Sequence, residues 1–134
     1  MPKPFETKAI SPRPDAIAPD GSRVRLLPAL AGGSFAHFEL PAGQTSGAVT
    51  HRTVEEIWYV VAGSGRLWRL QNGVESIDAL EPGTAVTIPL GTAFQFSAGE
   101  GAALVFVGVT MPPWPGVDEA VAVEGPWKPT ATLF

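Results

Sequence analysis

Short apolar runs dominate the chain from residue 23 onward, and Gly, Pro and Asn residues interrupt them at intervals of roughly ten residues. This spacing is typical of sandwiches and barrels of antiparallel strands, and no segment sustains the period of an α-helix. We therefore expect an all-β fold. The predicted strands are 23–27, 34–40, 56–61, 65–71, 74–79, 85–88, 94–97 and 102–110.

Three turn signals separate these strands. Asn72-Gly73 predicts a hairpin, because both central residues of a type I′ turn need positive φ and this dipeptide tolerates it. Glu81-Pro82-Gly83 and Pro89-Leu90-Gly91 each combine the fixed φ of proline with a permissive glycine. Each of them should therefore reverse the chain between two strands.

Composition narrows the functional classes. At 134 residues the chain suits one domain with its own core. The absence of cysteine excludes disulfides, thiol catalysis and zinc sites built on sulfur. The nine Lys and Arg residues are not clustered and the formal net charge is -4, which gives no electrostatic footprint for nucleic acid. We expect no nucleic-acid partner.

The two ends of the chain differ from its middle. Residues 1–22 are rich in proline and predict an extended arm, residues 23–111 predict the barrel, and residues 112–134 predict a Pro- and Trp-rich tail packed on it. The tail could be a lid over the barrel mouth or a strap on its outside, and we favour the strap. The longest apolar run, 102–109, is too short to cross a membrane. With no signal-peptide pattern at the N-terminus, a cytoplasmic protein without a membrane partner is expected.

The first motif contains His51, which lies shortly before the predicted strand 56–61. His51 precedes Glu56, and Gly63 follows Glu56 at the spacing E-x6-G. A second motif follows twenty residues later, where Gly83, Pro89 and Gly91 keep the spacing G-x5-P-x-G.

Together these segments, about 43–65 and 83–97, resemble the paired motifs of the cupin superfamily. The first cupin motif has two histidines, of which His51 supplies one, and Phe94 stands where the second motif has a histidine. The resemblance covers about residues 34–110. It implies an antiparallel double-stranded β-helix, or jelly-roll barrel, with a pocket for a small molecule inside.

The resemblance also places His51 and Glu56 inside the barrel, as candidate ligands for one divalent transition metal such as Mn, Fe, Ni or Zn. Two ligands are insufficient for tight binding. His37 would complete a set of two histidines and one carboxylate if residues 35, 37 and 39 face the interior. The alternative is a surface histidine on a partly exposed strand that titrates near its reference pKa.

Without a metal, His51 and Glu56 could form a hydrogen-bonded pair in a pocket, with the imidazole as general base and the carboxylate orienting it. The alternative is an ion pair at the barrel rim. The expected pocket residues are His37, Arg52, Thr53, Trp58, Phe94 and Phe96, with Trp68 or Trp114 as further candidates. Such an aromatic pocket suits a planar or partly hydrophobic ligand. Arg52 or Arg66 could clamp a carboxylate or phosphate, or could face solvent.

Strand 56–61 carries apolar residues on both faces, as does the run 104–107. A strand that hides both faces has the barrel interior on one side and a further layer on the other. We expect that layer to be a second subunit in a homodimer, although the arm or the tail could cover the same face within one chain.

Two functional classes follow. The first is a small cupin enzyme of the dioxygenase, isomerase or decarboxylase class that acts on a small organic molecule and is metal-dependent if His37 completes the site. The second is a metal-free cupin that binds a small molecule without turnover, as a sensor or accessory protein. A third ligand within reach of His51 and Glu56 decides between them.

Overall fold

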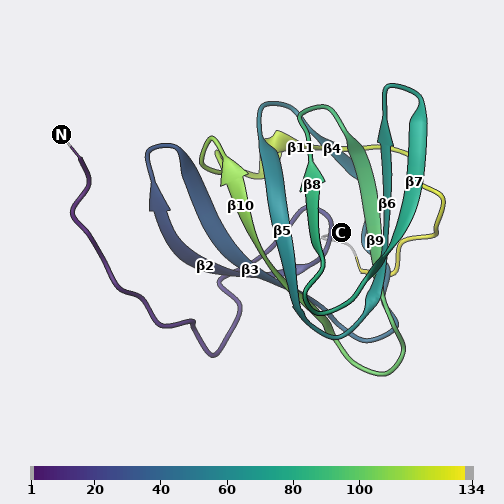
Figure 1. The fold of residues 1–134 in the computed structure, drawn as a ribbon, viewed down its shortest axis with the longest axis horizontal. Helices are drawn as coiled ribbons and strands as arrows, with labels where there is room; N and C mark the ends of the chain where they lie inside the picture. Colours follow the sequence, from purple (N-terminus) through teal and green to yellow (C-terminus); the bar gives the residue numbers. More distant parts are fainter. Residues whose placement is uncertain (1, 132–134) are drawn as a thin grey trace.

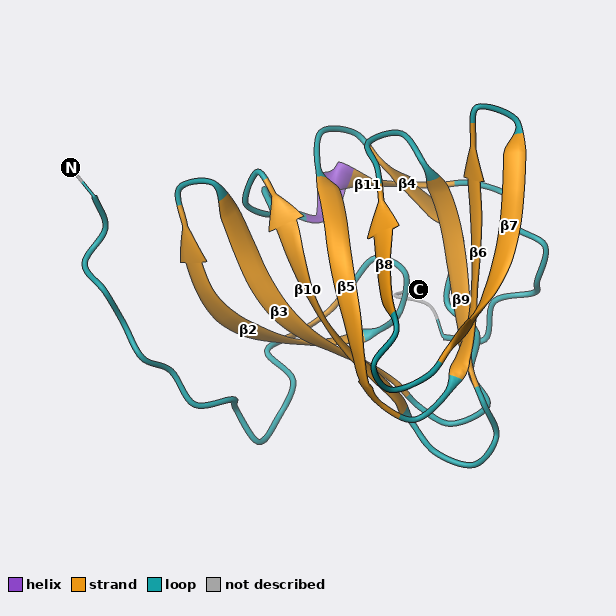
Figure 2. Cartoon of the chain, viewed as in Figure 1, coloured by secondary structure: helices purple, strands orange, loops and turns teal. Residues whose placement is uncertain are grey.

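The computed structural model describes residues 2–131, and strands account for nearly all of its regular structure (Figures 1 and 2). No helix among these residues is long and apolar enough to cross a membrane. The elements are β1 Ala16–Ile17, β2 Arg23–Leu30, β3 Gly33–Leu40, β4 Val49–His51, β5 Glu55–Ala62, β6 Gly65–Gln71, β7 Val74–Leu80, β8 Ala85–Ile88, β9 Ala93–Ala98, β10 Leu104–Met111, a 3₁₀ turn η1 Val117–Glu119, and β11 Ala120–Ala122.

The strands form two antiparallel sheets that face each other. One sheet has six strands in the order β1-β2-β3-β10-β5-β8, and the other has five in the order β11-β4-β9-β6-β7. Their inner faces bury one hydrophobic cluster, which includes Leu40, Trp58, Leu67, Phe96 and Phe106. The expected all-β jelly-roll architecture is confirmed.

All the strands that the sequence predicts are present, with bounds that differ by three residues at most. The predicted hairpin joins β6 to β7, and its central residues have positive φ, 50° for Asn72 and 77° for Gly73. Each predicted Pro-Gly turn closes with a backbone hydrogen bond, from Thr84 to Glu81 and from Thr92 to Pro89. The short strands β1, β4 and β11 are additions, because two or three residues carry too little pattern to predict a strand.

Strand β5 alternates between the two sides of its sheet. Glu56, Trp58 and Val60 are buried in the barrel, whereas Ile57, Tyr59 and Val61 are 46%, 50% and 43% exposed on the outer face. Among residues 2–131, neither the N-terminal arm nor the C-terminal tail covers these outward residues. The outer face of β5 is therefore apolar and open.

The N-terminal segment has two parts. Residues 2–14 run outside the barrel, and Figure 1 shows them leading away from β2. Residues 15–20 belong to the barrel, because β1 pairs with β2 and the Gly47 amide donates to the Asp20 carbonyl. The predicted arm, 1–22, therefore ends earlier than its sequence suggested. Met1 of that arm lies outside the described residues.

The C-terminal segment lines the cavity and also crosses the outside of the barrel. Trp114 lines the interior cavity, β11 then pairs with β4, and the backbone of Trp127 bonds to Gln95 on the outer face of the five-stranded sheet. The later part of the segment is therefore arranged as the strap that the sequence favoured. Residues 132–134 of the predicted tail lie outside the described residues.

Candidate functional site

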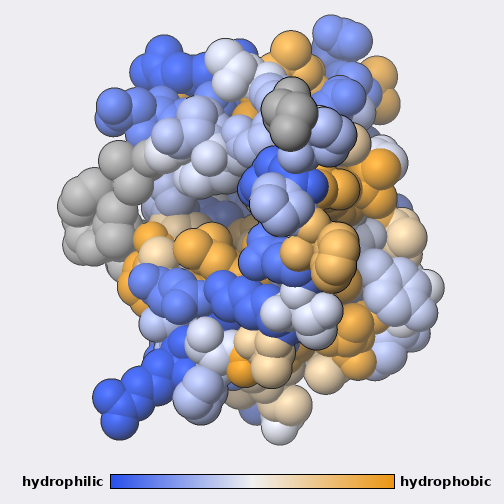
Figure 3. All heavy atoms as spheres, turned by 90° about the vertical axis from the view of Figure 1, so that its left-hand side faces the viewer, coloured by the Kyte–Doolittle hydropathy of each residue, from blue (hydrophilic) through white to orange (hydrophobic). Residues whose placement is uncertain are grey.

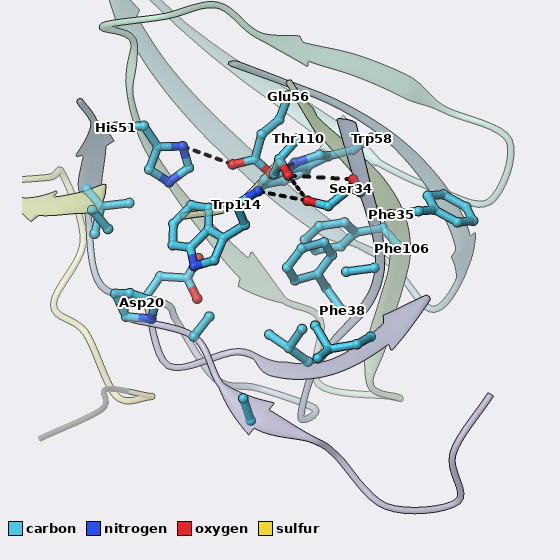
Figure 4. Close-up of a pocket in the computed structure, with 18 of the residues that line it drawn as sticks. Asp20, Ser34, Phe35, Phe38, His51, Glu56, Trp58, Phe106, Thr110 and Trp114 are labelled. Carbon is cyan, nitrogen blue, oxygen red and sulfur yellow. Dashed lines mark hydrogen bonds and ion pairs between the residues drawn. The ribbon is translucent and has the colours of Figure 1, made fainter. Parts of the chain in front are cut away.

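A cavity of about 390 Å³ lies between the inner faces of β2, β3, β5 and β10 and the segments that precede β2 and follow β10 (Figure 4). Its mouth is near β2, where Leu26 is about half exposed. The side of the molecule that carries β2 shows apolar side chains between polar ones (Figure 3). The cavity wall includes Asp20, Ser34, Ala36, Phe38, Val49, His51, Glu56, Trp58, Phe94, Phe106, Thr110 and Trp114.

His51 and Glu56 meet at the inner end of this cavity. His51 is the last residue of β4, and Glu56 is an inward residue of β5; both are more than nine-tenths buried. The His51 Nδ1 atom lies 3.0 Å from Glu56 Oε2. Figure 4 marks this contact, although its geometry falls short of a hydrogen bond. The Nδ1 side of the imidazole therefore faces the Glu56 carboxylate.

Glu56 is held from its other side. Its Oε1 accepts a hydrogen bond of 3.0 Å from the indole Nε1 of Trp58, two residues along the same strand face. Trp58 in turn stacks on Phe106 with ring centroids 4.1 Å apart. Gly108 allows this packing, because a Cβ there would lie 3.0 Å from the Trp58 ring. The carboxylate orientation thus depends on a packed aromatic side chain.

Aromatic rings surround the imidazole of His51. Phe94 of β9 and Trp114 contact it edge to face, with centroid distances of 5.3 Å and 5.1 Å. Trp114 is positioned by its backbone amide, which donates to Ser34 Oγ at 2.9 Å, and Ser34 also contacts the Thr110 hydroxyl (Figure 4). The polar end of the cavity is therefore narrow and has aromatic walls.

The loop after His51 is fixed by Glu119. This carboxylate, 4% exposed, accepts hydrogen bonds from Thr53 Oγ1 and from the backbone amides of Thr53 and Val54. Burial would raise the pKa of Glu119, but these hydrogen bonds outweigh it and hold the pKa below its ordinary value. The interaction joins η1 to the turn that leads from β4 into β5.

Asp20 is a cavity residue that the sequence did not reveal, because it lies in a proline-rich segment expected to be a loose arm. Its Oδ1 accepts hydrogen bonds from the backbone amide and the hydroxyl of Ser22. Burial raises the pKa of Asp20, the Ser22 hydrogen bonds oppose that change, and the negative charge of Glu56 adds to it. Figure 4 shows Asp20 beside Trp114, on the side of the cavity that also holds His51.

The expected pocket residues divide into two groups. Trp58 and Phe94 line the cavity with His51 and Glu56, and so does Trp114. Phe96 is fully buried but packs behind Trp58 and Phe106, away from the cavity. Trp68 is on the outer face of β6, where its indole donates to Glu75.

Both arginines that were candidates for a carboxylate or phosphate clamp lie outside the cavity. Arg52 is exposed and donates to the Asp118 carbonyl, and neighbouring Thr53 faces Glu119. Arg66 is exposed and stacks over the Trp127 ring at 4.6 Å. The expectation that Arg52, Arg66 or Thr53 borders the ligand is therefore corrected: each has a partner elsewhere.

His37 also lies on the other face of its strand. The inward residues of β3 are Ser34, Ala36, Phe38 and Leu40, so His37 points outward. Burial and then the charge of Arg25 lower the pKa of His37, against the opposing effect of Glu39. The expected set of His37, His51 and Glu56 therefore does not assemble, and His37 is not a pocket residue.

The donors present do not fit a resident transition-metal ion. Within residues 2–131, no group of three His, Cys, Asp or Glu side chains is placed to hold one. Phe94, 1% exposed, fills the position where the second cupin motif would supply a histidine. His51 and Glu56 remain as two donors, short of the three protein ligands that such sites use.

Comparison with known proteins supports the fold. No family model and no curated protein matches the sequence. A variant of oxalate decarboxylase from B. subtilis superposes with a TM-score of 0.68 at 19% identity, over 78% of this chain and 29% of that one. A protein with a double-stranded β-helix domain from Klebsiella pneumoniae gives 0.64 at 16% identity, over 78% and 85%. KdgF from Halomonas sp. gives 0.58 at 22% identity, over 69% and 81%.

These identities are low, so the likeness concerns architecture and not chemistry. The shared architecture, the inward pair His51 and Glu56, and the turns at Gly83 and Gly91 are consistent with one another. The chain has the cupin fold, a double-stranded β-helix whose second motif carries Phe94 in place of a histidine.

Proposed function

We propose that this protein binds a small, largely apolar organic molecule in the barrel cavity, with the His51–Glu56 pair contacting its polar group. The observation that carries the proposal is a cavity of about 390 Å³ whose apolar walls end at two buried ionisable side chains. Ligand pockets commonly have such a volume and such a lining, with a few polar groups that orient the ligand.

Binding can be tested with ligand-observed NMR on a mixture of small aromatic and aliphatic molecules of different charge. The two histidines of the chain provide a matched pair of variants, because His51 lines the cavity and His37 faces outward. His51→Ala should weaken the binding of any hit by about tenfold or more, the value of one buried polar contact. His37→Ala should leave it unchanged.

A third variant, Ala36→Phe, should block binding by filling the cavity from the inner face of β3 without changing any polar group. Binding that survives both His51→Ala and Ala36→Phe would occur elsewhere on the protein, and the proposal would be rejected. Circular dichroism melting curves show whether each variant is folded.

Turnover by proton transfer is a second candidate, favoured by the 3.0 Å contact between His51 and Glu56. In that reaction the imidazole would take a proton from the bound molecule and the carboxylate would stabilise the charged ring. Small aryl ketones incubated with the protein in D₂O should lose their α-proton NMR signals faster than in buffer, and His51→Ala should abolish the difference. An unchanged exchange rate argues for binding alone.

A metal-dependent enzyme has weaker support, because no group of three His, Asp or Glu side chains among residues 2–131 is placed to hold an ion. The test is elemental analysis of the purified protein and of Glu56→Gln, before and after incubation with manganese, iron, nickel and zinc. Near-stoichiometric metal in the wild type that falls in the variant would restore this class. Absence of metal from both, even after incubation, would leave the binding function.

A further inference from the structure

Acidic groups outnumber basic groups in the wall of the cavity. Asp20 and Glu56 contribute two carboxyl groups, and His51 contributes one imidazole. Among the described residues that line the cavity there is no lysine or arginine. His51 can pair with one carboxyl group at most, so one acidic group of the cavity has no cationic side chain as a partner.

Two arginines that are adjacent in sequence to wall residues, Arg25 and Arg52, have other partners. Arg25 pairs with Glu39 at 3.1 Å on the outer face, and its guanidinium also donates to the Ser11 carbonyl. Arg52 donates to the Asp118 carbonyl. A carboxylate or phosphate entering the cavity would therefore meet two acidic side chains and no guanidinium. Like charges that are close together in a poorly hydrated site repel strongly.

The walls around these carboxyl groups suit a positive charge. Trp58, Phe94 and Trp114 all line the same end of the cavity, and the negative face of an aromatic ring attracts a cation, most strongly for tryptophan. His51, more than nine-tenths buried, lies at the same end and faces Glu56 through Nδ1. Beyond this end, Phe38, Phe106 and Leu27 offer only apolar contacts.

We propose that the cavity selects organic cations, in which a protonated amine lies between Asp20 and Glu56 and a compact apolar body fills the space against Phe38 and Phe106. This inference rests on the proposed binding function and specifies its ligand class. An ammonium group would pair with this acidic group and favour the ionised form of Asp20 against the effect of burial on its pKa. It would also donate hydrogen bonds to the carboxylates and lie among aromatic rings.

The test compares three molecules of similar size and shape at neutral pH: phenethylamine, 2-phenylethanol and phenylacetate. Binding is measured by isothermal titration calorimetry and by the fluorescence of Trp58 and Trp114. The amine should bind about tenfold or more tightly than the alcohol, and phenylacetate should bind most weakly, as expected for a charge-assisted contact.

Equal or tighter binding of the alcohol or phenylacetate would overturn the charge selection and leave the proposed binding function standing. Failure of all three to bind, at concentrations where calorimetry detects weak complexes, would count against both. The two failures therefore give different results.

Variants then locate the cation. Asp20→Asn keeps an acceptor for Ser22 and removes only the charge, and Glu56→Gln does the same beside Trp58. Each should reduce the affinity for the amine by about tenfold and change that for the alcohol little. The matched control is Asp15→Asn, which is on the same segment but outside the cavity wall. An equal loss of amine binding in Asp15→Asn would assign the effect to the overall charge, and the proposal would be rejected.

Discussion

Gln95 and Trp127 exchange a pair of hydrogen bonds that join the C-terminal segment to the middle strand of the five-stranded sheet. The Gln95 Nε2 atom donates to the Trp127 carbonyl at 2.9 Å, and the Trp127 amide donates to Gln95 Oε1 at 3.1 Å. The same Nε2 atom also donates to the Ser46 carbonyl. At this point the tail therefore bonds to a fully buried side chain on the outer face of β9, and not to the backbone of a neighbouring strand.

Replacing Gln95 by Leu should therefore destabilise the protein by about 2 kcal/mol or more, because it leaves backbone groups of Trp127 and Ser46 buried without partners. Urea denaturation followed by tryptophan fluorescence measures this loss. Gln71→Leu, at the exposed end of β6, serves as the control and should change stability little. Equal stability of the two variants would mean that the tail does not depend on this amide pair.

Glu119 gives a prediction about pH. Its pKa in the folded protein is lower than the ordinary value of 4.5, so the contribution of the carboxylate is fully present above that value. The contribution is lost as the pH falls through the lower pKa of the folded state. Glu119→Gln should therefore lower the free energy of unfolding by about 1–3 kcal/mol at neutral pH, since it replaces one acceptor oxygen by an NH₂ group and removes the negative charge from the remaining hydrogen bonds.

The difference between the wild type and Glu119→Gln should shrink in strongly acidic buffer, where the wild-type carboxyl is protonated as well. Urea denaturation at neutral pH and below the ordinary glutamate pKa checks this. Glu124→Gln is an exposed control in the same segment and should show neither effect. A difference that stays constant with pH would show that packing, and not the charge of Glu119, makes the contribution.

The sequence predicted the fold well because its signals are local. The Asn72-Gly73 turn and the Pro-Gly turns fix where strands end, and strand β5 alternates as expected. Strand β3 did not reveal its inner face, because Phe35 and Phe38 place an aromatic residue on each side. Only the pairing with β10 shows that Phe38 stacks on Phe106 and that His37 is on the outer face.

The candidate site was predicted in part for the same reason. His51 and Glu56 belong to a spaced motif, and their contact could be expected from it. Asp20 enters the cavity through the pairing of β1 with β2 and through a hydrogen bond from Gly47. These contacts connect a proline-rich segment to distant parts of the chain, and nothing in the sequence around Asp20 indicates them.

The open apolar face of β5 supports the prediction of a homodimer, which we propose buries Ile57, Tyr59 and Val61. Tyr59→Glu would place a charge in the centre of that interface and should convert a dimer into a monomer, as measured by size-exclusion chromatography with light scattering. Val74→Glu is the control, because Val74 is an exposed apolar residue on the other sheet. A wild-type protein that remains monomeric at high concentration would exclude this dimer.

Phe94 provides a test of whether a third donor would complete a metal site. Its ring centroid lies 5.3 Å from that of His51, so Phe94→His would place a third donor beside His51 and Glu56. We expect this variant to bind Ni²⁺ or Zn²⁺ about tenfold or more tightly than the wild type in calorimetry, because three protein ligands are the usual minimum for such ions.

Burying an imidazole in place of a phenylalanine should also lower stability by about 2–4 kcal/mol in the absence of metal. Metal should then raise the melting temperature of the variant, since it binds only the folded state. Phe96→His has a similar cost in the core but no contact with His51, and should gain no metal affinity. Equal metal binding by the two variants would show that His51 and Glu56 are not arranged to share an ion with residue 94.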